Sequence, residues 1–440
     1  MLLDELTSNV INNDNTSRSN IQEKQTQCNI FVKLQEVQIM NSDVIRERRE
    51  DILKIVEGLD ITPTMYNNAV EKYEAIAKFL DDKGIDAHLY PQGSFSIGTV
   101  VKPQVRKRQA DYDLDVICEV NYNKNDITPD ALYEELKYAL KSDGRYSPRL
   151  DFYDECITVN YSDVNGVGFS IDLVPSVHET PDRIISMKSR SLHPDLCDTS
   201  IAITTDKASD WGSSNPKGYQ SWFESVNQKF IDYGVHTNVN RLLLENRSAY
   251  TTADDIPKPL IRTPLQRVIQ LLKAHNNEYF NKPQIKDYKV KSVIIATLAT
   301  TIAKNAPTHY NTFELLDYVV NELAGYSLLR ENHILFKSVQ PLKTLIRYDG
   351  KEWNIANPSN PDDNLADSWN ENSKNVTYFF NWINAVLQDF NSLNNADNNV
   401  GVINIFGESM LSRTDSGKKY IPQRSSPVSI TAHNKPWRAQ

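Results

Sequence analysis

The chain has 440 residues, of which 40% are hydrophobic and 24% are charged, and its formal net charge is −9. This length exceeds what one hydrophobic core usually covers, so we expect two lobes, and the composition is ordinary for a folded chain. The acidic balance argues against a large basic footprint for nucleic acid and leaves a local basic patch open, and we expect that long nucleic acid is not required.

The four cysteines are too far apart for a C-x-x-C metal or redox motif, which favours reduced thiols in the cytoplasm. The first thirty residues are polar and lack the continuous apolar core of a secretory signal. The longest apolar run, residues 293–302, is too short to span a bilayer. The sequence therefore predicts a cytoplasmic protein with no membrane partner. The cysteines are Cys28, Cys118, Cys156 and Cys197.

The first elements of the chain are predicted to be helical. Residues 1–40 are rich in Asn, Ser, Thr and Gln and are interpreted as a polar N-terminal extension. Apolar periodicity predicts helices over 43–59 and 64–82, and a short strand over 87–90. That strand leads directly into a Gly-Ser turn.

The turn at Gln92-Gly93-Ser94 is a candidate anion-binding loop. Gly93 lets the backbone approach a ligand closely, and Ser94 offers a hydroxyl and an N–H to phosphate oxygens. Gly98 and Thr99 are expected to continue this loop. The P-loop spacing is missing, and a Gly-Ser pair alone is typical of ordinary turns, so the interpretation depends on the residues that follow.

Two carboxylates follow on a second predicted strand. Asp113 and Asp115 are two residues apart, so both side chains leave the strand on the same face. They repel each other unless a cation lies between them, and carboxylate oxygens suit magnesium. Asp111 and Asp113 form the same pattern, but we prefer Asp113 and Asp115 because Val116 and Ile117 continue the strand after them.

A third carboxylate lies in the next pair of strands. A helix is predicted over 129–140, and residues 156–177 form two β-rich segments around Asn165-Gly166, a strong hairpin signal. The second segment places Phe169 and Ile171 on one face and Asp172 on the other. Asp172 in this apolar context indicates a metal shared with the other two acids, and a solvated strand face is the alternative.

The rest of the chain is predicted to be mainly helical. Helices are expected over 265–280, 291–303, 312–323 and 378–393. Four aromatic residues could stack on a base, although aromatics at such spacing more often belong to a core. They are Trp211, Tyr219, Trp222 and Phe223.

Three segments together resemble a known family. The runs QGSFSIGT, DYDLDV and FSIDLVP resemble the nucleotidyltransferase superfamily of DNA polymerase beta. More narrowly, the chain resembles bacterial cyclic-oligonucleotide synthases related to cyclic GMP-AMP synthase and oligoadenylate synthase, from about residue 62 onward. The resemblance implies an α+β fold, in which a polymerase-beta-like lobe with a small mixed sheet is joined to a helical C-terminal lobe.

The domain organisation that follows has four parts, with nucleotides bound between the two lobes. They are an N-terminal polar extension (1–40), a catalytic lobe (41–210), a helical lobe (211–416) and a C-terminal tail (417–440).

The resemblance also implies roles for individual residues. Three acids are implied to be catalytic and to hold two Mg²⁺ ions, for which Mn²⁺ can substitute. Lys273 matches a basic residue that steadies nucleotide phosphates, and the alternative is a solvated lysine over an apolar face. The implied metal ligands are Asp113, Asp115 and Asp172. The implied nucleotide-binding residues are Gln92, Gly93, Ser94, Thr99, Lys273 and Ser292.

The activity implied is the joining of NTPs, with ATP among them, into a cyclic di- or oligonucleotide second messenger with release of pyrophosphate. The expected setting is antiphage signalling by a monomer, under the control of a regulatory protein or a small molecule. Two alternatives stay open: a nucleotidyltransferase that adds a nucleotide to RNA or protein, and a catalytically silent module that binds nucleotide or senses RNA.

Overall fold

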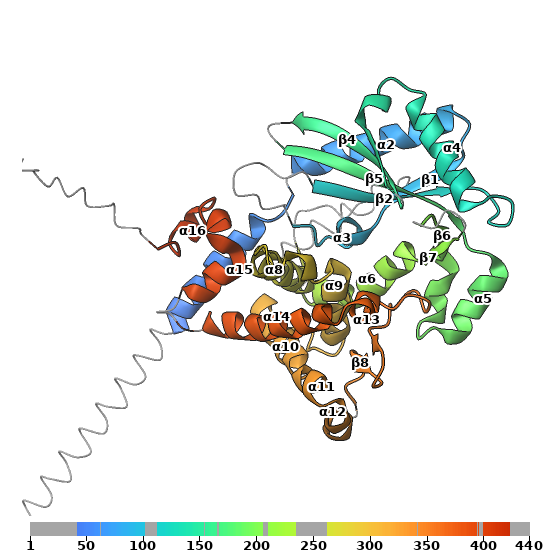
Figure 1. The fold of residues 1–440 in the computed structure, drawn as a ribbon. Coiled ribbons are helices and arrows are strands. Elements are labelled where there is room, and N and C mark those ends of the chain that lie inside the picture. The colour runs from blue at the N-terminus through green and yellow to red at the C-terminus, as the bar shows by residue number, and fades with distance from the viewer. Residues whose placement is uncertain are drawn as a thin grey trace, which may run out of the picture.

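The computed structural model shows a mixed sheet joined to a set of helices (Figure 1). The predicted α+β class is confirmed, with a small mixed sheet and a helical lobe. The residues that the structure describes are 42–61, 63–101, 112–153, 155–164, 167–205, 210–234, 262–340, 342–393, 395 and 399–422.

The main sheet has its central strands in the order β1-β2-β5-β4-β3, and β6 and β7 continue from β5. β2 and β5 are parallel, whereas β1 pairs with β2, and β4 with β5, in antiparallel fashion. A parallel neighbour needs a long crossover, and the chain between β2 and β5 supplies it with a helix and two strands. The strands are β1 (Ala87–Pro91), β2 (Tyr112–Val120), β3 (Leu150–Phe152), β4 (Ile157–Val164), β5 (Val167–His178), β6 (Ile201–Ile203) and β7 (Gly212–Ser214).

The predicted hairpin is confirmed by the pairing of β4 with β5. Val164 is the partner of Val167 across the two-residue connection, and Tyr161 is the partner of Phe169 further along. The register shifts between these two pairs, which marks a β-bulge. Asn165 and Gly166 themselves lie outside the described residues.

The sheet buries one face under two helices, α2 (Pro63–Asp82) and α4 (Pro129–Lys141). The even-numbered residues of β2 point into this core, with Leu114 and Val116 fully buried. Because side chains alternate along a strand, the odd-numbered residues of β2 point to the opposite face. Figure 1 shows the helical lobe on that opposite side of the sheet.

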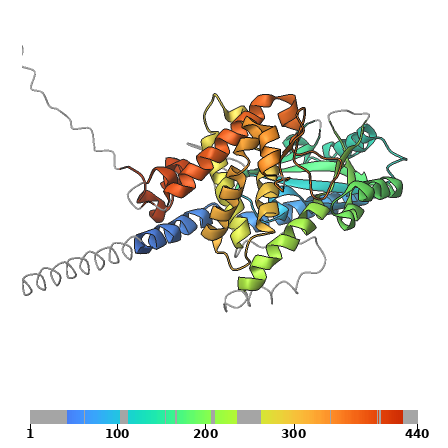
Figure 2. The same ribbon diagram turned by 90° about the horizontal axis from the view of Figure 1, so that it is seen from below.

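The helical lobe has a second hydrophobic core of its own. Trp222 and Phe223 belong to this core, as expected for aromatics at their spacing. A helix over residues 42–57 also packs into it through Ile52 and Ile55, so the beginning of the described chain lies against the helical lobe (Figure 2). The boundaries of the four predicted parts stay predictions. The longer helices are α6 (Pro216–Gly234), α8 (Pro264–Tyr279), α9 (Ser292–Ala303), α10 (Thr312–Ala324), α14 (Ser373–Ser392) and α15 (Val400–Leu411).

Local capping signals explain where several helices begin. Thr263 and Gln266 form a capping box at the start of α8, and Asn311 and Glu314 form another at the start of α10. α14 begins five residues before the predicted start at 378, because the Asn372 side chain accepts a hydrogen bond from a backbone N–H of its first turn. None of the helices in the described residues combines the length and apolar content that crossing a membrane would need.

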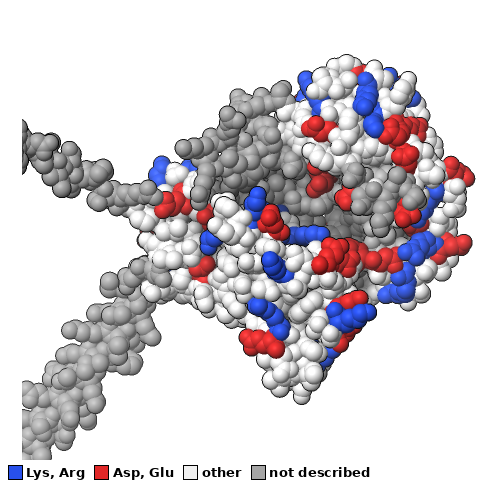
Figure 3. All heavy atoms as spheres, viewed as in Figure 1, with Lys and Arg blue, Asp and Glu red and all other residues white. Residues whose placement is uncertain are grey.

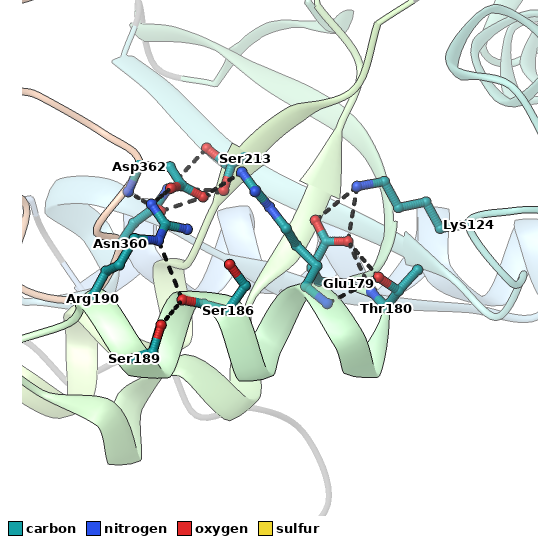
Figure 4. Close-up of polar contacts among 10 residues, drawn as sticks. Lys124, Glu179, Thr180, Ser186, Ser189, Arg190, Ser213, Asn360 and Asp362 are labelled. Carbon is teal, nitrogen blue, oxygen red and sulfur yellow. Dashed lines mark hydrogen bonds and ion pairs between the residues drawn. The ribbon is translucent and has the colours of Figure 1, made fainter.

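A loop over residues 357–364, here called the latch loop, ties the helical lobe to the sheet side. Ser359 and Asn360 are buried, and the Ser359 carbonyl accepts a hydrogen bond of 2.8 Å from Asn215 Nδ2. Asn360 Nδ2 donates to the Ser213 carbonyl at 3.2 Å (Figure 4). Buried polar groups that are paired in this way specify one arrangement, because an alternative would leave them unsatisfied.

The latch loop also carries a charged contact. Asp362 accepts from Arg183 Nη2 at 2.6 Å and from Arg190 Nη1, and both arginines lie on α5 (Pro181–Arg190). The carboxylate is mostly buried, whereas both guanidinium side chains are about half exposed. Charge-assisted bonds of this kind are stronger than neutral ones, although exposure weakens them.

The latch loop leads to a prediction about stability. Asp362→Asn should lower the free energy of unfolding by about 1 kcal/mol, because two charge-assisted bonds are weakened in a partly buried site. Asp198→Asn is the control, since Asp198 pairs at 2.6 Å with Lys188, which also lies on α5. This ion pair is exposed and lies within one lobe. Urea unfolding at low and high salt measures both. Equal losses in the two variants would contradict a special role for the latch loop.

Candidate active site

The sheet brings two of the predicted acids to directly paired positions. Asp115 of β2 is the register partner of Asp172 of β5, and Asp113 is the partner of Ser170. Asp115 is exposed and Asp172 is half-buried. The strand register therefore places Asp113, Asp115 and Asp172 on one face, as the alternation predicts, although the side chain of Asp113 is not among those described. Asp111 lies outside the described residues.

A hydroxyl on the neighbouring strand orients one carboxylate. Thr158 of β4 is the register partner of Asp172, and its buried hydroxyl donates a hydrogen bond of 2.6 Å to Asp172 Oδ1. Sequence reasoning missed Thr158, which acts on Asp172 by fixing one of its oxygens.

The pKa of the Cys156 thiol is affected by the negative charge of these acids. Its Sγ lies 3.9 Å from Thr158 Oγ1. Burial, followed by the negative charges of Asp172 and Asp115, raises the pKa of Cys156 to about 11. The site therefore has a negative potential that disfavours a further anion and favours a cation.

The Gly-Ser turn packs against Asp115. The Gln92 N–H donates to the Asp115 carbonyl at 2.8 Å, which joins the turn to β2. Gly93 has a φ of +63°, and a Cβ at this position would lie 3.2 Å from Asp115 Oδ2. Gly93 is exposed and Ser94 half-buried, at the start of the short helix α3 (Gly93–Ser96). Only a glycine combines this left-handed conformation with so close an approach to a carboxylate.

Lys273 of α8 brings a positive charge to the same place. Its Nζ donates to the Thr99 carbonyl at 2.9 Å, and its side chain is buried. Loss of hydration and the positive charge of Lys289 lower the pKa of Lys273 to about 8, while Asp115 acts in the opposite direction. Lys273 is thus not the solvated lysine that the sequence left open as an alternative.

Thr99 and Ser292 are two further residues that the sequence predicts to bind nucleotide. Thr99 is buried, and its backbone carbonyl is the group that meets Lys273. Ser292 is the first residue of α9, and it is exposed. Contact of either residue with a nucleotide stays a prediction.

The donor set suits a hard divalent cation. Asp115 and Asp172 present carboxylate oxygens from neighbouring strands, and oxygen ligands are those that magnesium and manganese prefer. Among the described side chains no group of three His, Cys, Asp or Glu residues forms a ready ligand set. Asp113 is the residue whose strand position would supply a third carboxylate.

Charges of both signs are mixed over the face of the molecule in Figure 3. Lys and Arg side chains alternate with Asp and Glu across the white surface, without a broad region of positive charge. Among the described residues of this face, the distribution agrees with the net charge of −9 and shows no extended basic surface for nucleic acid.

Comparison with known proteins shows which domain this part of the chain is similar to. Residues 87–174 match the model of the nucleotidyltransferase domain of DncV-like cyclic GMP-AMP synthase. This segment holds the Gly-Ser turn and the strand positions of all three acids. This part of the chain is therefore similar to the nucleotidyltransferase domain of DncV-like proteins, and the predicted resemblance is confirmed.

Two curated relatives extend the match beyond this domain. The chain is 27% identical over 364 residues to a c-di-GMP synthase of Roseivirga ehrenbergii. This match covers 81% of this chain and 82% of the relative. The chain is 26% identical over 238 residues to the cyclic dinucleotide synthase CdnG of Bradyrhizobium diazoefficiens, which covers 51% of this chain and 52% of the relative. Nucleotidyltransferase chemistry, and hence an enzyme, is what these matches support.

A solved structure shows the same fold. The structure of CdnG from Bradyrhizobium diazoefficiens in complex with GTP superposes with a TM-score of 0.57 at 20% identity, and the match covers 86% of this chain and 98% of that one. The likeness therefore includes the helical lobe as well as the sheet, and it confirms the predicted two-part architecture.

The geometry of Gly93 leads to a prediction with a matched control. Gly93→Ala should weaken nucleotide binding by about tenfold or more, because the new methyl group meets the Asp115 carboxylate where the turn approaches it. Gly84→Ala is the control, since Gly84 has a similar φ of +77° and nothing within 4 Å of an added Cβ.

Both variants should lose roughly 1–2 kcal/mol of stability from the left-handed conformation. Thermal unfolding measures this shared cost, and calorimetric titration with a non-hydrolysable NTP measures binding. Equal nucleotide affinity in the two variants would show that Gly93 serves the turn alone.

Proposed function

We propose that this protein is a metal-dependent nucleotidyltransferase that joins NTPs into a cyclic dinucleotide and releases pyrophosphate. The observation that carries the proposal is the direct pairing of Asp115 with Asp172 on parallel strands, with the Gly93 turn packed against Asp115. A like-charged pair held at this position, beside a turn with phosphate-binding groups, supports a metal and triphosphate site.

Each residue has a role in this proposal. Asp113, Asp115 and Asp172 would hold two Mg²⁺ ions, or Mn²⁺ in their place, which activate the attacking ribose hydroxyl and neutralise the triphosphate. Gly93 and Ser94 would bind phosphate oxygens through backbone N–H groups and the hydroxyl. The further proposed nucleotide contacts are Gln92, Thr99, Lys273 and Ser292.

Other side chains support these groups. Thr158 fixes the orientation of the Asp172 carboxylate by donating to its Oδ1, which would help to present the carboxylate to a cation. Lys273 already donates to Thr99, and the ammonium group has further N–H donors for phosphate oxygens. No covalent intermediate with the protein is needed for attack on the α-phosphorus.

The substrate proposal rests on the relatives. The match to a c-di-GMP synthase over 81% of the chain makes GTP the first substrate to test, with ATP next. We further propose that the product is a second messenger in antiphage signalling, made by a cytoplasmic monomer whose activity a protein or small molecule controls. The choice of base depends on pocket contacts that the acids and the turn do not determine.

The acids provide the direct test. Asp115→Asn and Asp172→Asn should each bring pyrophosphate release from labelled NTPs with Mg²⁺ or Mn²⁺ below detection, because the cation loses a charged ligand. Asp151→Asn is the control, because Asp151 lies on the strand β3 and bonds to Asn160 at 2.7 Å. Circular dichroism establishes that all three variants are folded. Undiminished release in either site variant would refute the metal role.

The product identifies the reaction. The wild-type chain, incubated with four labelled NTPs and then with phosphatase, should give a resistant species whose mass fits a cyclic dinucleotide. Label found on added RNA or protein would instead support the alternative nucleotidyltransferase. Nucleotide binding with no pyrophosphate release under any metal would support a silent module.

The pKa of Lys273 gives a pH dependence with a definite sign. The Lys273 ammonium loses its proton as pH rises through about 8, so the Kd for a non-hydrolysable NTP should rise above that pH, by at most about tenfold per pH unit. Lys273→Met should bind more weakly at pH 7 and lack this rise. In the absence of nucleotide the sign is reversed: a lowered pKa in the folded state makes stability increase between about pH 8 and 10.5. An identical binding profile in Lys273→Met would contradict the phosphate contact.

A further inference from the structure

α8 presents three donors to the segment that follows the Gly-Ser turn. Gln266, Gln270 and Lys273 are spaced four and three residues apart, so they share one face of the helix. All three side chains are buried. Their bonds are Gln266 Nε2 to the Ile97 carbonyl at 3.0 Å, Gln270 Nε2 to the Val100 carbonyl at 2.9 Å and Lys273 Nζ to the Thr99 carbonyl at 2.9 Å. This set of three residues is here called the clamp.

Gly98 lets the side chains at the start of α8 approach the backbone closely. Its φ is +67°, and a Cβ on it would lie 2.3 Å from Arg262 Nη1 and 2.5 Å from Gln266 Nε2. A side chain here would be strained by the left-handed conformation and would require the ends of the Arg262 and Gln266 side chains to move. The structure shows Gly98 packed against the start of α8, and its place in an anion-binding loop stays a prediction.

The amide of Gln270 is fixed on both sides. Its Oε1 accepts from Arg267 Nη1 at 2.9 Å, and its Nε2 also donates to Asp60 Oδ1 at 2.8 Å. Arg267 Nη2 in turn pairs with Asp60 Oδ2 at 2.9 Å. Because the oxygen is engaged by an arginine, the Nε2 group must face the Val100 carbonyl. Gln270 is therefore held by a network and cannot turn away without breaking it.

The clamped segment is continuous with the turn at the acids. The Thr99 N–H donates to the Ser94 carbonyl at 2.8 Å, and the Gln92 N–H donates to the Asp115 carbonyl at 2.8 Å. The turn is thus held at one end by β2 and at the other by α8. A shift of the clamped carbonyls would move Gly93 and Ser94 relative to Asp115.

We infer that Gln266 and Gln270 are positioning residues, which hold the backbone of the Gly-Ser turn against Asp115 for triphosphate binding. The inference rests on the proposed function, because it assigns the turn to nucleotide. Neither glutamine is required to touch the nucleotide itself. Their effect is carried by the carbonyls of Ile97 and Val100, and so by the position of Ser94.

The test uses variants of similar shape in the full chain. Gln266→Met and Gln270→Met keep the length of the side chain and remove the donor. The control is Trp382→Phe, which removes the bond of 2.9 Å from Trp382 Nε1 to His275 Nδ1 elsewhere on α8. Thermal unfolding compares the stability of the three variants, so that a general loss of stability is recognised.

Two readouts separate positioning from structure. The first is amide hydrogen exchange of the peptide over residues 93–101 without nucleotide, which should be faster in both Met variants and unchanged in Trp382→Phe. The second is the Kd for a non-hydrolysable GTP analogue with Mn²⁺, which should rise about five- to tenfold in the Met variants alone.

The outcomes distinguish this inference from the proposed function. If the wild-type chain binds the analogue and the Met variants bind as well as Trp382→Phe does, the positioning role is overturned while the proposed function stands. If the wild-type chain binds no nucleotide, the proposed function fails and the positioning role fails with it. Exchange over residues 93–101 that is equal in all variants overturns the clamp whatever the nucleotide result.

Discussion

The repulsion between two carboxylates on neighbouring strands is the constraint on which the rest of the site depends. Like charges at directly paired positions destabilise a sheet, yet Asp115 and Asp172 cannot slide apart. Leu114 and Val116 pair with Ile171 and Leu173 in the buried core, and a slip of one residue would turn these side chains to the other face. The hydrophobic face of the sheet therefore enforces the acidic pair on the opposite face.

The helical lobe contributes the opposite charge to the same place. A buried lysine costs free energy, and the lowered pKa of Lys273 records that cost in the unliganded protein. Lys273 and Asp115 come from different lobes, so the arrangement exists only while the lobes are joined. Side chains that are unfavourable by themselves and gathered from two lobes are typical of a site whose ligand offsets their cost.

Alternation and turn chemistry predict much of the sheet. They place Asp113 and Asp115 on one face of their strand, Asp172 on the face opposite Phe169 and Ile171, and the hairpin at residues 165–166, because these features depend on neighbours in the chain. Thr158 was beyond such reasoning, because a hairpin with that turn and no bulge would put Val159 opposite Asp172. The bulge between Tyr161 and Val164 moves Thr158 into that position, and no local signal marks it.

Contacts between distant segments were also beyond the sequence. Gln270 meets Asp60 from 210 residues away, and Asp362 meets Arg183 from 179 residues away, without any periodic pattern that links them. These two contacts belong to the two ties between the lobes: the network that anchors the clamp, and the latch loop. The clamp bonds α8 to the backbone beside the turn, and the latch loop bonds the helical lobe to β7 and α5, so both ties support the relative positions of the turn, the acids and Lys273 that the structure shows. Groups placed in advance need no reorganisation at the moment of reaction, which is the condition under which fixed charges are most effective.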